Sequence, residues 1–174
     1  MMKTPHQLAN EGYDNFMKVF AEVYEHSAWI IEESYEKVKE NPLYDDIEMF
    51  HYLLSVIVLN ANKQYQDDLI LAHPMLAGKK AIQNELTDFS NDEQQSAGLD
   101  SCSEDEIALF DELNEKYFKK FAFPFIIAVK GKNKEEIIEN FLERLQNTLK
   151  DEHKTALQQI NKIGLLRIKG IYDK

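Results

Sequence analysis

The chain has 174 residues, of which 44% are hydrophobic and 29% charged, and its formal net charge is −11 at pH 7. One domain with a substantial hydrophobic core is the natural expectation for this length. The acidic excess disfavours nucleic acids and anionic membrane surfaces as partners, although a small anionic substrate is compatible with locally concentrated cations. Cys102 is the single cysteine, which excludes an intramolecular disulfide and a cysteine metal cluster.

The sequence also predicts where the protein resides. Residues 1–15 are polar and lack a signal-peptide pattern, and no apolar run approaches membrane-spanning length. The last residues do not form a peroxisomal address. We therefore expect a soluble, cytoplasmic protein.

Apolar residues at helical spacing predict a series of amphipathic helices in the first part of the chain. The expected segments are a helix over 15–23, a helix capped by Ser27 and ended by Asn41-Pro42, a helix started by Asp45 or Asp46, and a short helix within 60–71. This part contains few glycines and prolines, which favours long helices over strands and turns.

Two capping-box patterns, in which a serine precedes a glutamate by three residues, mark helix starts in the middle of the chain. Ser90 with Glu93 predicts a helix over about 91–97, and Ser103 with Glu106 predicts a longer one after it.

The remaining segments complete an all-helical prediction. Residues 123–129 are apolar but have no visible strand partner, so we expect a buried loop or half-strand. Residues 134–149 and 151–168 have the spacing of amphipathic helices. The predicted fold is all-α, a single compact domain over 1–174 with about eight helices and a Pro/Gly-rich active-site loop region.

His73 is the leading candidate for chemistry. Pro74 restricts it to extended backbone, so it should follow the end of a helix. An imidazole there could act as a general acid or base near neutral pH, and an ordinary capping or packing role is the alternative. The remaining histidines show no pair at helical spacing, so no metal site is predicted from His6, His26, His51 and His153.

Glu93, followed by Gln94, has two interpretations. The carboxylate could complete the capping box with Ser90, or it could face the Pro/Gly loop from a helix N-terminus, where exposed amides also suit a carboxylate or carbonyl of a ligand.

The segment from Phe123 to Ile127 and the two arginines are further candidates. The side chains of the segment should pack in the core, while its unpartnered backbone could bind a heterocycle with amide-like edges. Arg144 has charged neighbours, so a solvated helix face is expected. Arg167 is flanked by apolar residues, and a partly buried arginine needs an anion such as a carboxylate.

Three motifs carry a resemblance to a known family. They are His73-Pro74-x-Leu76-Ala77-Gly78-Lys79, Ser90-x-x-Glu93-Gln94-x-x-Ala97-Gly98-Leu99, and Leu113-Asn114-x-x-Tyr117 leading into Lys120-Phe121-Ala122-Phe123-Pro124-Phe125. Fainter matches cover 16–29, 143–145 and 166–167. In their order and spacing these segments resemble the 2-oxo-4-hydroxy-4-carboxy-5-ureidoimidazoline (OHCU) decarboxylase family of urate degradation.

The resemblance implies an all-helical homodimer that needs no cofactor or metal and acts on a small anionic imidazoline. It implies a carboxy-lyase that converts the imidazoline to (S)-allantoin and CO₂, with His73 as catalytic histidine and Glu93 as its carboxylate partner. The implied substrate-binding residues are Pro74, Ser90, Gln94, Phe125, Ile126, Ile127, Ala128, Val129 and Arg167. One departure is Ala122, where a glycine is common, and alanine costs little there unless the position needs a positive φ.

Two alternatives stay open. The same scaffold and chemistry could serve another ureido- or carboxy-heterocycle. A non-catalytic helical interaction module, in which the histidine, glutamate and arginine are structural, predicts no pocket and no loss of function when His73 is changed.

Overall fold

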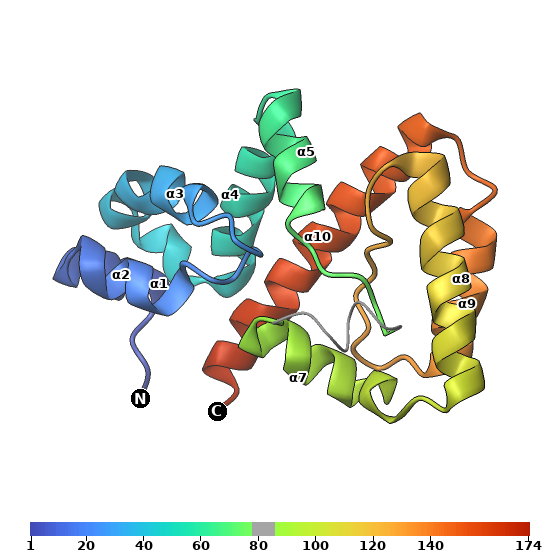
Figure 1. The fold of residues 1–174 in the computed structure, drawn as a ribbon. Coiled ribbons are helices and arrows are strands. Elements are labelled where there is room, and N and C mark those ends of the chain that lie inside the picture. Colours follow the sequence, from blue (N-terminus) through green and yellow to red (C-terminus); the bar gives the residue numbers. More distant parts are fainter. Residues whose placement is uncertain (78–85) are drawn as a thin grey trace. The chain divides into compact units, whose positions relative to one another are not determined.

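The computed structural model describes residues 1–77 and 86–174 of the chain (Figure 1). These residues form two compact units. The terminal unit comprises residues 1–72 and 161–174, and the central unit comprises residues 73–160. Gly78 and Lys79 of the first motif lie outside the described residues.

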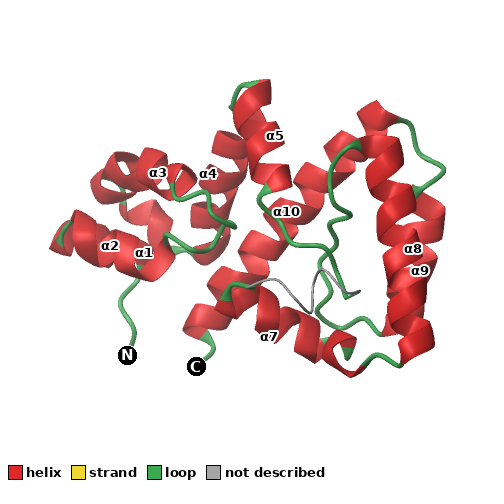
Figure 2. Cartoon of the chain, viewed as in Figure 1, coloured by secondary structure: helices red, strands yellow, loops and turns green. Residues whose placement is uncertain are grey.

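All regular structure in the two described stretches is helical, and Figure 2 shows only helix and loop there. The α-helices are α1 (Pro5–Glu11), α2 (Tyr13–Phe20), α3 (Trp29–Glu40), α4 (Ile47–Asn60), α5 (Lys63–Leu71), α7 (Asp88–Ser96), α8 (Glu104–Phe121), α9 (Lys134–Arg144) and α10 (Leu149–Tyr172). Two 3₁₀ turns, η1 (Pro42–Asp45) and η2 (Leu99–Ser101), complete the set. The all-α prediction is confirmed, and the single-domain interpretation of 1–174 stays a prediction.

Aromatic side chains fill the core of the terminal unit. Phe16 and Phe20 of α2 and Phe50 of α4 are fully buried, and the Phe20 and Phe50 rings lie 4.9 Å apart in an edge-to-face arrangement. Tyr24 is buried close to Gly164 of α10, where an added Cβ would lie 3.0 Å from the ring. A glycine therefore allows the ring to pack directly against the helix backbone.

A second aromatic cluster forms the core of the central unit. Phe125 stacks on Phe141 of α9 with ring centroids 3.7 Å apart, and Tyr117 of α8 meets both rings edge-on. Phe110 of α8 also contacts Phe141, so α8 and α9 lie side by side (Figure 1). The buried loop after α8 thus shares its core with the two helices.

Several predicted helix ends are confirmed. Asp46 caps α4, α3 ends at Glu40 directly before Asn41-Pro42, and Ser103 with Glu106 forms the capping box that starts α8. The Ser27 cap is wrong, because α3 has Ala28 at its N-cap and the Ser27 hydroxyl instead donates to the Glu25 carbonyl at 2.8 Å.

Candidate active site

The backbone that follows His73 is held by Gln94. Gln94 is buried on α7, its Oε1 accepts a hydrogen bond from the Ala77 N–H at 3.1 Å, and its Nε2 donates to the Met75 carbonyl at 3.4 Å. Pairing with an N–H donor and a C=O acceptor fixes the orientation of the amide. Both ends of this predicted site residue therefore bond to the chain's own backbone.

Asn114 of α8 holds the same stretch from a second helix. Its Nδ2 donates to the Leu76 carbonyl at 2.9 Å, while its Oδ1 is buried without a hydrogen-bond partner among the described residues. The next residue, Ala77, has φ of 46°, in the left-handed region. Two amides from two helices thus impose a costly backbone turn four residues after His73.

His73 lies two residues after the end of α5, as its position before Pro74 predicted. Its side chain is buried, with 8% of its surface exposed, and Pro74 is half-buried. An imidazole shielded from bulk water can exchange a proton with a bound ligand without competition from solvent.

The capping box predicted for Ser90 and Glu93 is wrong. Helix α7 begins one turn earlier, with Thr87 as N-cap accepting the Ser90 N–H at 3.2 Å, so Ser90 is the third helical residue. A threonine three residues before the serine is also a favoured cap, and the Ser-x-x-Glu pattern falls inside the helix. Glu93 is half-buried one turn further along, and the capping interpretation no longer explains it.

Residues 123–129 form the expected buried loop. Every side chain from Phe125 to Val129 has at most 4% of its surface exposed. Two side chains anchor its backbone: the Ala128 N–H donates to Gln159 Oε1 at 3.0 Å, and the Ile126 carbonyl accepts from Arg144 Nη1 at 2.6 Å. Side chains here replace the strand partner that an extended segment would otherwise need.

Arg144 contradicts its predicted solvated position. It is 7% exposed, its Nε and Nη2 lie 2.7 and 2.5 Å from Glu152 Oε1, and its guanidinium lies 4.3 Å from the centre of the Phe125 ring. The helical phase explains this, because Arg144 lies on the same stripe of α9 as Ile137 and Phe141, the other buried residues of that helix. Sequence reasoning missed this residue.

Arg167 is buried in the terminal unit, at 4% exposure. Its Nη2 donates to Glu25 Oε1 at 3.0 Å and its Nη1 donates to the Val23 carbonyl at 3.2 Å. The predicted need for an anion is met by Glu25, itself 1% exposed, which sequence reasoning did not identify. The other predicted site residues belong to the central unit, so a shared site with Arg167 stays a prediction.

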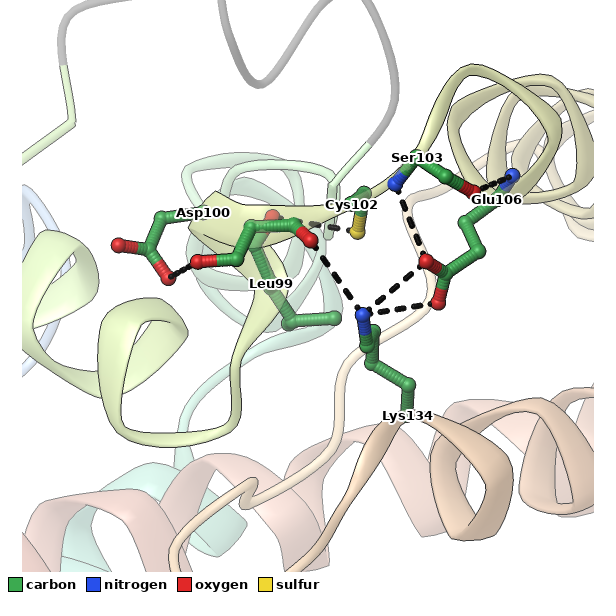
Figure 3. Close-up of polar contacts among 7 residues, drawn as sticks. Leu99, Asp100, Cys102, Ser103, Glu106 and Lys134 are labelled. Carbon is green, nitrogen blue, oxygen red and sulfur yellow. Dashed lines mark hydrogen bonds and ion pairs between the residues drawn. The ribbon is translucent and has the colours of Figure 1, made fainter.

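Polar contacts at the start of α8 fasten it to α9 (Figure 3). Lys134 Nζ lies 3.1 and 2.9 Å from the two carboxylate oxygens of Glu106 and 3.4 Å from the Ser101 carbonyl. The hydrogen bond from Lys134, followed by that from the Ser103 N–H, lowers the pKa of Glu106 to about 2. Burial raises the pKa of the nearby Cys102 thiol, which favours its protonated form.

Within 1–77 and 86–174, no group of three or more histidine, cysteine, aspartate or glutamate side chains could hold a metal ion. No helix in these ranges is long and apolar enough to cross a membrane.

The chain belongs to the OHCU decarboxylase family, because the family model of that description matches residues 10–169. A 2-oxo-4-hydroxy-4-carboxy-5-ureidoimidazoline decarboxylase from Haloferax volcanii is 34% identical over 89% of this chain and 88% of that protein. One from Halalkalicoccus jeotgali is 32% identical over 97% of this chain and 91% of that protein.

Longer relatives and solved structures add to the comparison. A uric acid degradation bifunctional protein from Bacillus sp. (strain TB-90) is 37% identical over 95% of this chain, which spans only 32% of that protein. The crystal structure of (S)-allantoin synthase matches with a TM-score of 0.77 at 24% identity, covering 98% of this chain and 54% of that one. A crystal structure of OHCU decarboxylase in the presence of (S)-allantoin matches with a TM-score of 0.68 at 24% identity, covering 88% and 97%. These structures support the all-helical fold.

Proposed function

We propose that this protein is a carboxy-lyase that converts 2-oxo-4-hydroxy-4-carboxy-5-ureidoimidazoline to (S)-allantoin and CO₂ in urate degradation. The observation that carries this proposal is the match of residues 10–169 to the OHCU decarboxylase family, in a chain whose motif histidine is buried. The similarity to proteins of that name over nearly their full length supports the same substrate.

The substrate carries its own electron sink. When the bond to the carboxylate carbon breaks, CO₂ leaves and the electron pair forms a C=C bond to the carbon that bears the ureido group. The electron pair of the former C=N bond moves to the ring nitrogen, which takes a proton. The hydroxyl-bearing carbon becomes a carbonyl as its hydroxyl loses a proton, and one proton is added at the carbon that bears the ureido group. The side on which that proton arrives decides which enantiomer forms.

The residues divide these tasks. His73 assists the departure of CO₂ and delivers the proton to one face, and Glu93 holds the hydroxyl or ureido group by hydrogen bonds. Ser90 and Pro74 contact the substrate, and Arg167 orients an anionic or carbonyl edge of it while staying bonded to Glu25 and to the Val23 carbonyl. Gln94 contributes by holding the backbone after His73 in place.

The apolar wall supplies the environment for the reaction. The buried segment Phe125–Val129 excludes water and disfavours a free carboxylate next to it. Because decarboxylation converts that carboxylate to neutral CO₂, an apolar surface favours the transition state over the charged ground state.

We further propose a cytoplasmic homodimer. Large apolar side chains of α4 and α5 are exposed in the terminal unit, with Tyr52 at 63%, Leu59 at 54% and Leu71 at 53%. Exposed apolar area of this kind suits an interface between copies. Light scattering after size exclusion should give twice the mass of 20.3 kDa, and a monomer at micromolar concentration would contradict the dimer.

Circular dichroism of allantoin formation tests the activity. The unstable substrate is generated in place from urate by urate oxidase and hydroxyisourate hydrolase. We expect wild-type protein to produce a rapid single-enantiomer signal and His73→Ala and Glu93→Ala to lose it with the helical far-UV spectrum intact. Loss of a general acid–base group of this kind lowers kcat by ~10²–10⁴-fold.

Asp92→Asn is the matched control for Glu93, because it removes an exposed carboxylate from the neighbouring position of α7. This variant should retain wild-type activity. No acceleration by wild-type protein over the racemic background would favour a related heterocycle as substrate. Full activity in both alanine variants would overturn the site assignment.

A further inference from the structure

A charged network in the central unit holds the predicted binding loop through one carbonyl. Arg144 Nη1 donates to the Ile126 carbonyl at 2.6 Å, while its Nε and Nη2 face Glu152 Oε1. Both side chains are buried, with Glu152 at 0% and Arg144 at 7% exposure. The guanidinium therefore joins a carboxylate on one side to the loop backbone on the other.

Two further side chains orient the carboxylate. Tyr117 of α8 donates its hydroxyl to Glu152 Oε1 at 2.5 Å, and Asn147 donates its Nδ2 to Oε2 at 3.0 Å. Burial and the bond to Glu152 raise the pKa of the Tyr117 hydroxyl, which stays a donor. Because both carboxylate oxygens of Glu152 accept hydrogen bonds, the plane of the carboxylate is fixed. The planar guanidinium of Arg144 that pairs with it is therefore held in one orientation.

The loop also contacts the guanidinium through the Phe125 ring. The Phe125 ring lies 4.3 Å from the guanidinium carbon, and the same ring stacks on Phe141 at 3.7 Å. The adjacent residues Phe125 and Ile126 thus contact Arg144 by ring face and carbonyl. A displacement of Arg144 would move the loop at both points.

We propose that Arg144 is a positioning residue for the decarboxylation, acting through the buried loop Phe125–Val129 and itself oriented by Glu152, Tyr117 and Asn147. The inference rests on the proposed function, since it takes the loop to be the wall that contacts the substrate. Substrate binding then depends on the position in which Arg144 holds the Ile126 carbonyl. Small displacements of groups that position a substrate have large effects on rate.

Arg144→Lys separates position from charge. A lysine keeps the positive charge beside Glu152, but its single ammonium lacks the planar fork that reaches both the carboxylate and the Ile126 carbonyl. We expect KM to rise about tenfold. We also expect faster hydrogen–deuterium exchange in the peptide covering residues 123–129 of the unliganded variant.

The rise in KM distinguishes positioning from a structural role. A variant that merely unfolds in part has less active enzyme, so kcat falls and KM is unchanged. Tyr117→Phe is the gentler variant, because it removes one donor from Glu152 and keeps the ring, and KM should rise roughly threefold. It also tests the proposal if the lysine variant does not fold.

Lys134→Met is the matched control. It removes a cation from the same helix, α9, along with an ion pair to Glu106 and a bond to the Ser101 carbonyl. Both KM and exchange over 123–129 should stay at wild-type values. Unchanged KM in Tyr117→Phe and in a folded Arg144→Lys, with wild-type protein active, would overturn the positioning role alone. A wild-type protein without activity would instead refute the proposed function, and the positioning role would fall with it.

Discussion

Arg144 and Arg167 are the two arginines of the chain, and each unit buries one of them. Each bonds one buried glutamate and one backbone carbonyl, the partners being Glu152 and Ile126 for Arg144, and Glu25 and Val23 for Arg167. The pairs differ in sequence separation, which is 8 residues for Arg144–Glu152 and 142 for Arg167–Glu25. The first closes the connection between two consecutive helices, and the second joins distant parts of the chain.

The difference in sequence separation means that two similar buried arginine–glutamate pairs stabilise different parts of the structure. A buried ion pair adds little over a well-packed apolar pair, but removing one partner leaves a buried charge without compensation. In the central unit that charge would lie against the loop over residues 125–129. In the terminal unit it would lie between the end of α10 and residues 23–25, so the loss should affect how these two segments of the unit are held together.

Glu152→Leu should have the largest effect. It removes the carboxylate that binds Arg144, Tyr117 and Asn147 and leaves the guanidinium charge buried. We expect a loss of about 3–5 kcal/mol in the free energy of unfolding, measured by denaturant titration. Glu143→Gln, at the exposed position next to Arg144, should change it by less than about 0.5 kcal/mol. A loss below about 1 kcal/mol for Glu152→Leu would support the solvated position that the sequence predicted for Arg144.

Glu25→Gln tests the second pair with a milder change. The amide keeps one oxygen to accept from Arg167 Nη2 but loses the charge, so a loss of about 1.5–3 kcal/mol is expected. Glu22→Gln, an exposed neighbour, is the control for the same charge change. If Glu25→Gln and Glu22→Gln have equal free energies of unfolding in denaturant titration, the buried pair contributes nothing to the terminal unit.

The helical fold could be predicted because apolar spacing and caps are local signals. The Ser103 cap of α8 followed from a pattern a few residues long. Helix α1 was missed although Thr4, Pro5 and Gln7 form a capping box with proline at the first turn, which is an equally local signal. Errors of one turn at helix starts, as at Thr87, arise where two side chains compete for the same cap.

The candidate site could be predicted only in part. The position of His73 just after a helix followed from the placement of Pro74, and the burial of Phe125–Val129 followed from apolar content. The burial of Arg144 could have been predicted from helical spacing, because Arg144 follows Phe141 by three residues and lies on the buried side of α9. No local pattern could identify Glu25 as the partner of Arg167, because the contact depends on how distant segments of the terminal unit pack.

A substitution at Ala122, directly before the loop held by Arg144, is expected to stabilise the protein instead of destabilising it. It ends α8 with φ of 62° and ψ of 25°, the left-handed conformation in which glycine is favoured. Ala122→Gly should therefore stabilise the protein by about 0.5–1 kcal/mol, the relief of backbone strain exceeding the extra entropy of the unfolded chain. Ala108→Gly, inside the same helix and exposed, should cost about 1 kcal/mol in the same denaturation assay. Destabilisation by both glycines would mean that the left-handed conformation carries no strain at Ala122.

The smallest effect on stability is expected from Lys134→Met, which breaks a pair at the surface instead of a buried one. In the wild type, ionised Glu106 stabilises the fold above its unfolded pKa, near the usual 4.5, and this contribution is lost as the pH falls through about 2. Without Lys134 the pKa of Glu106 should rise toward its usual value, so the loss should begin at higher pH. The pKa of Glu106 should stay below its usual value because the Ser103 N–H still donates to Glu106.

Titration of the Glu106 carboxyl carbon by NMR measures the shift, with Glu104, an exposed glutamate in the same turn, as the internal reference. An unchanged pKa would mean that the helix cap alone holds the carboxylate. A rise with unaltered stability at neutral pH would set this half-buried pair apart from the two buried ones.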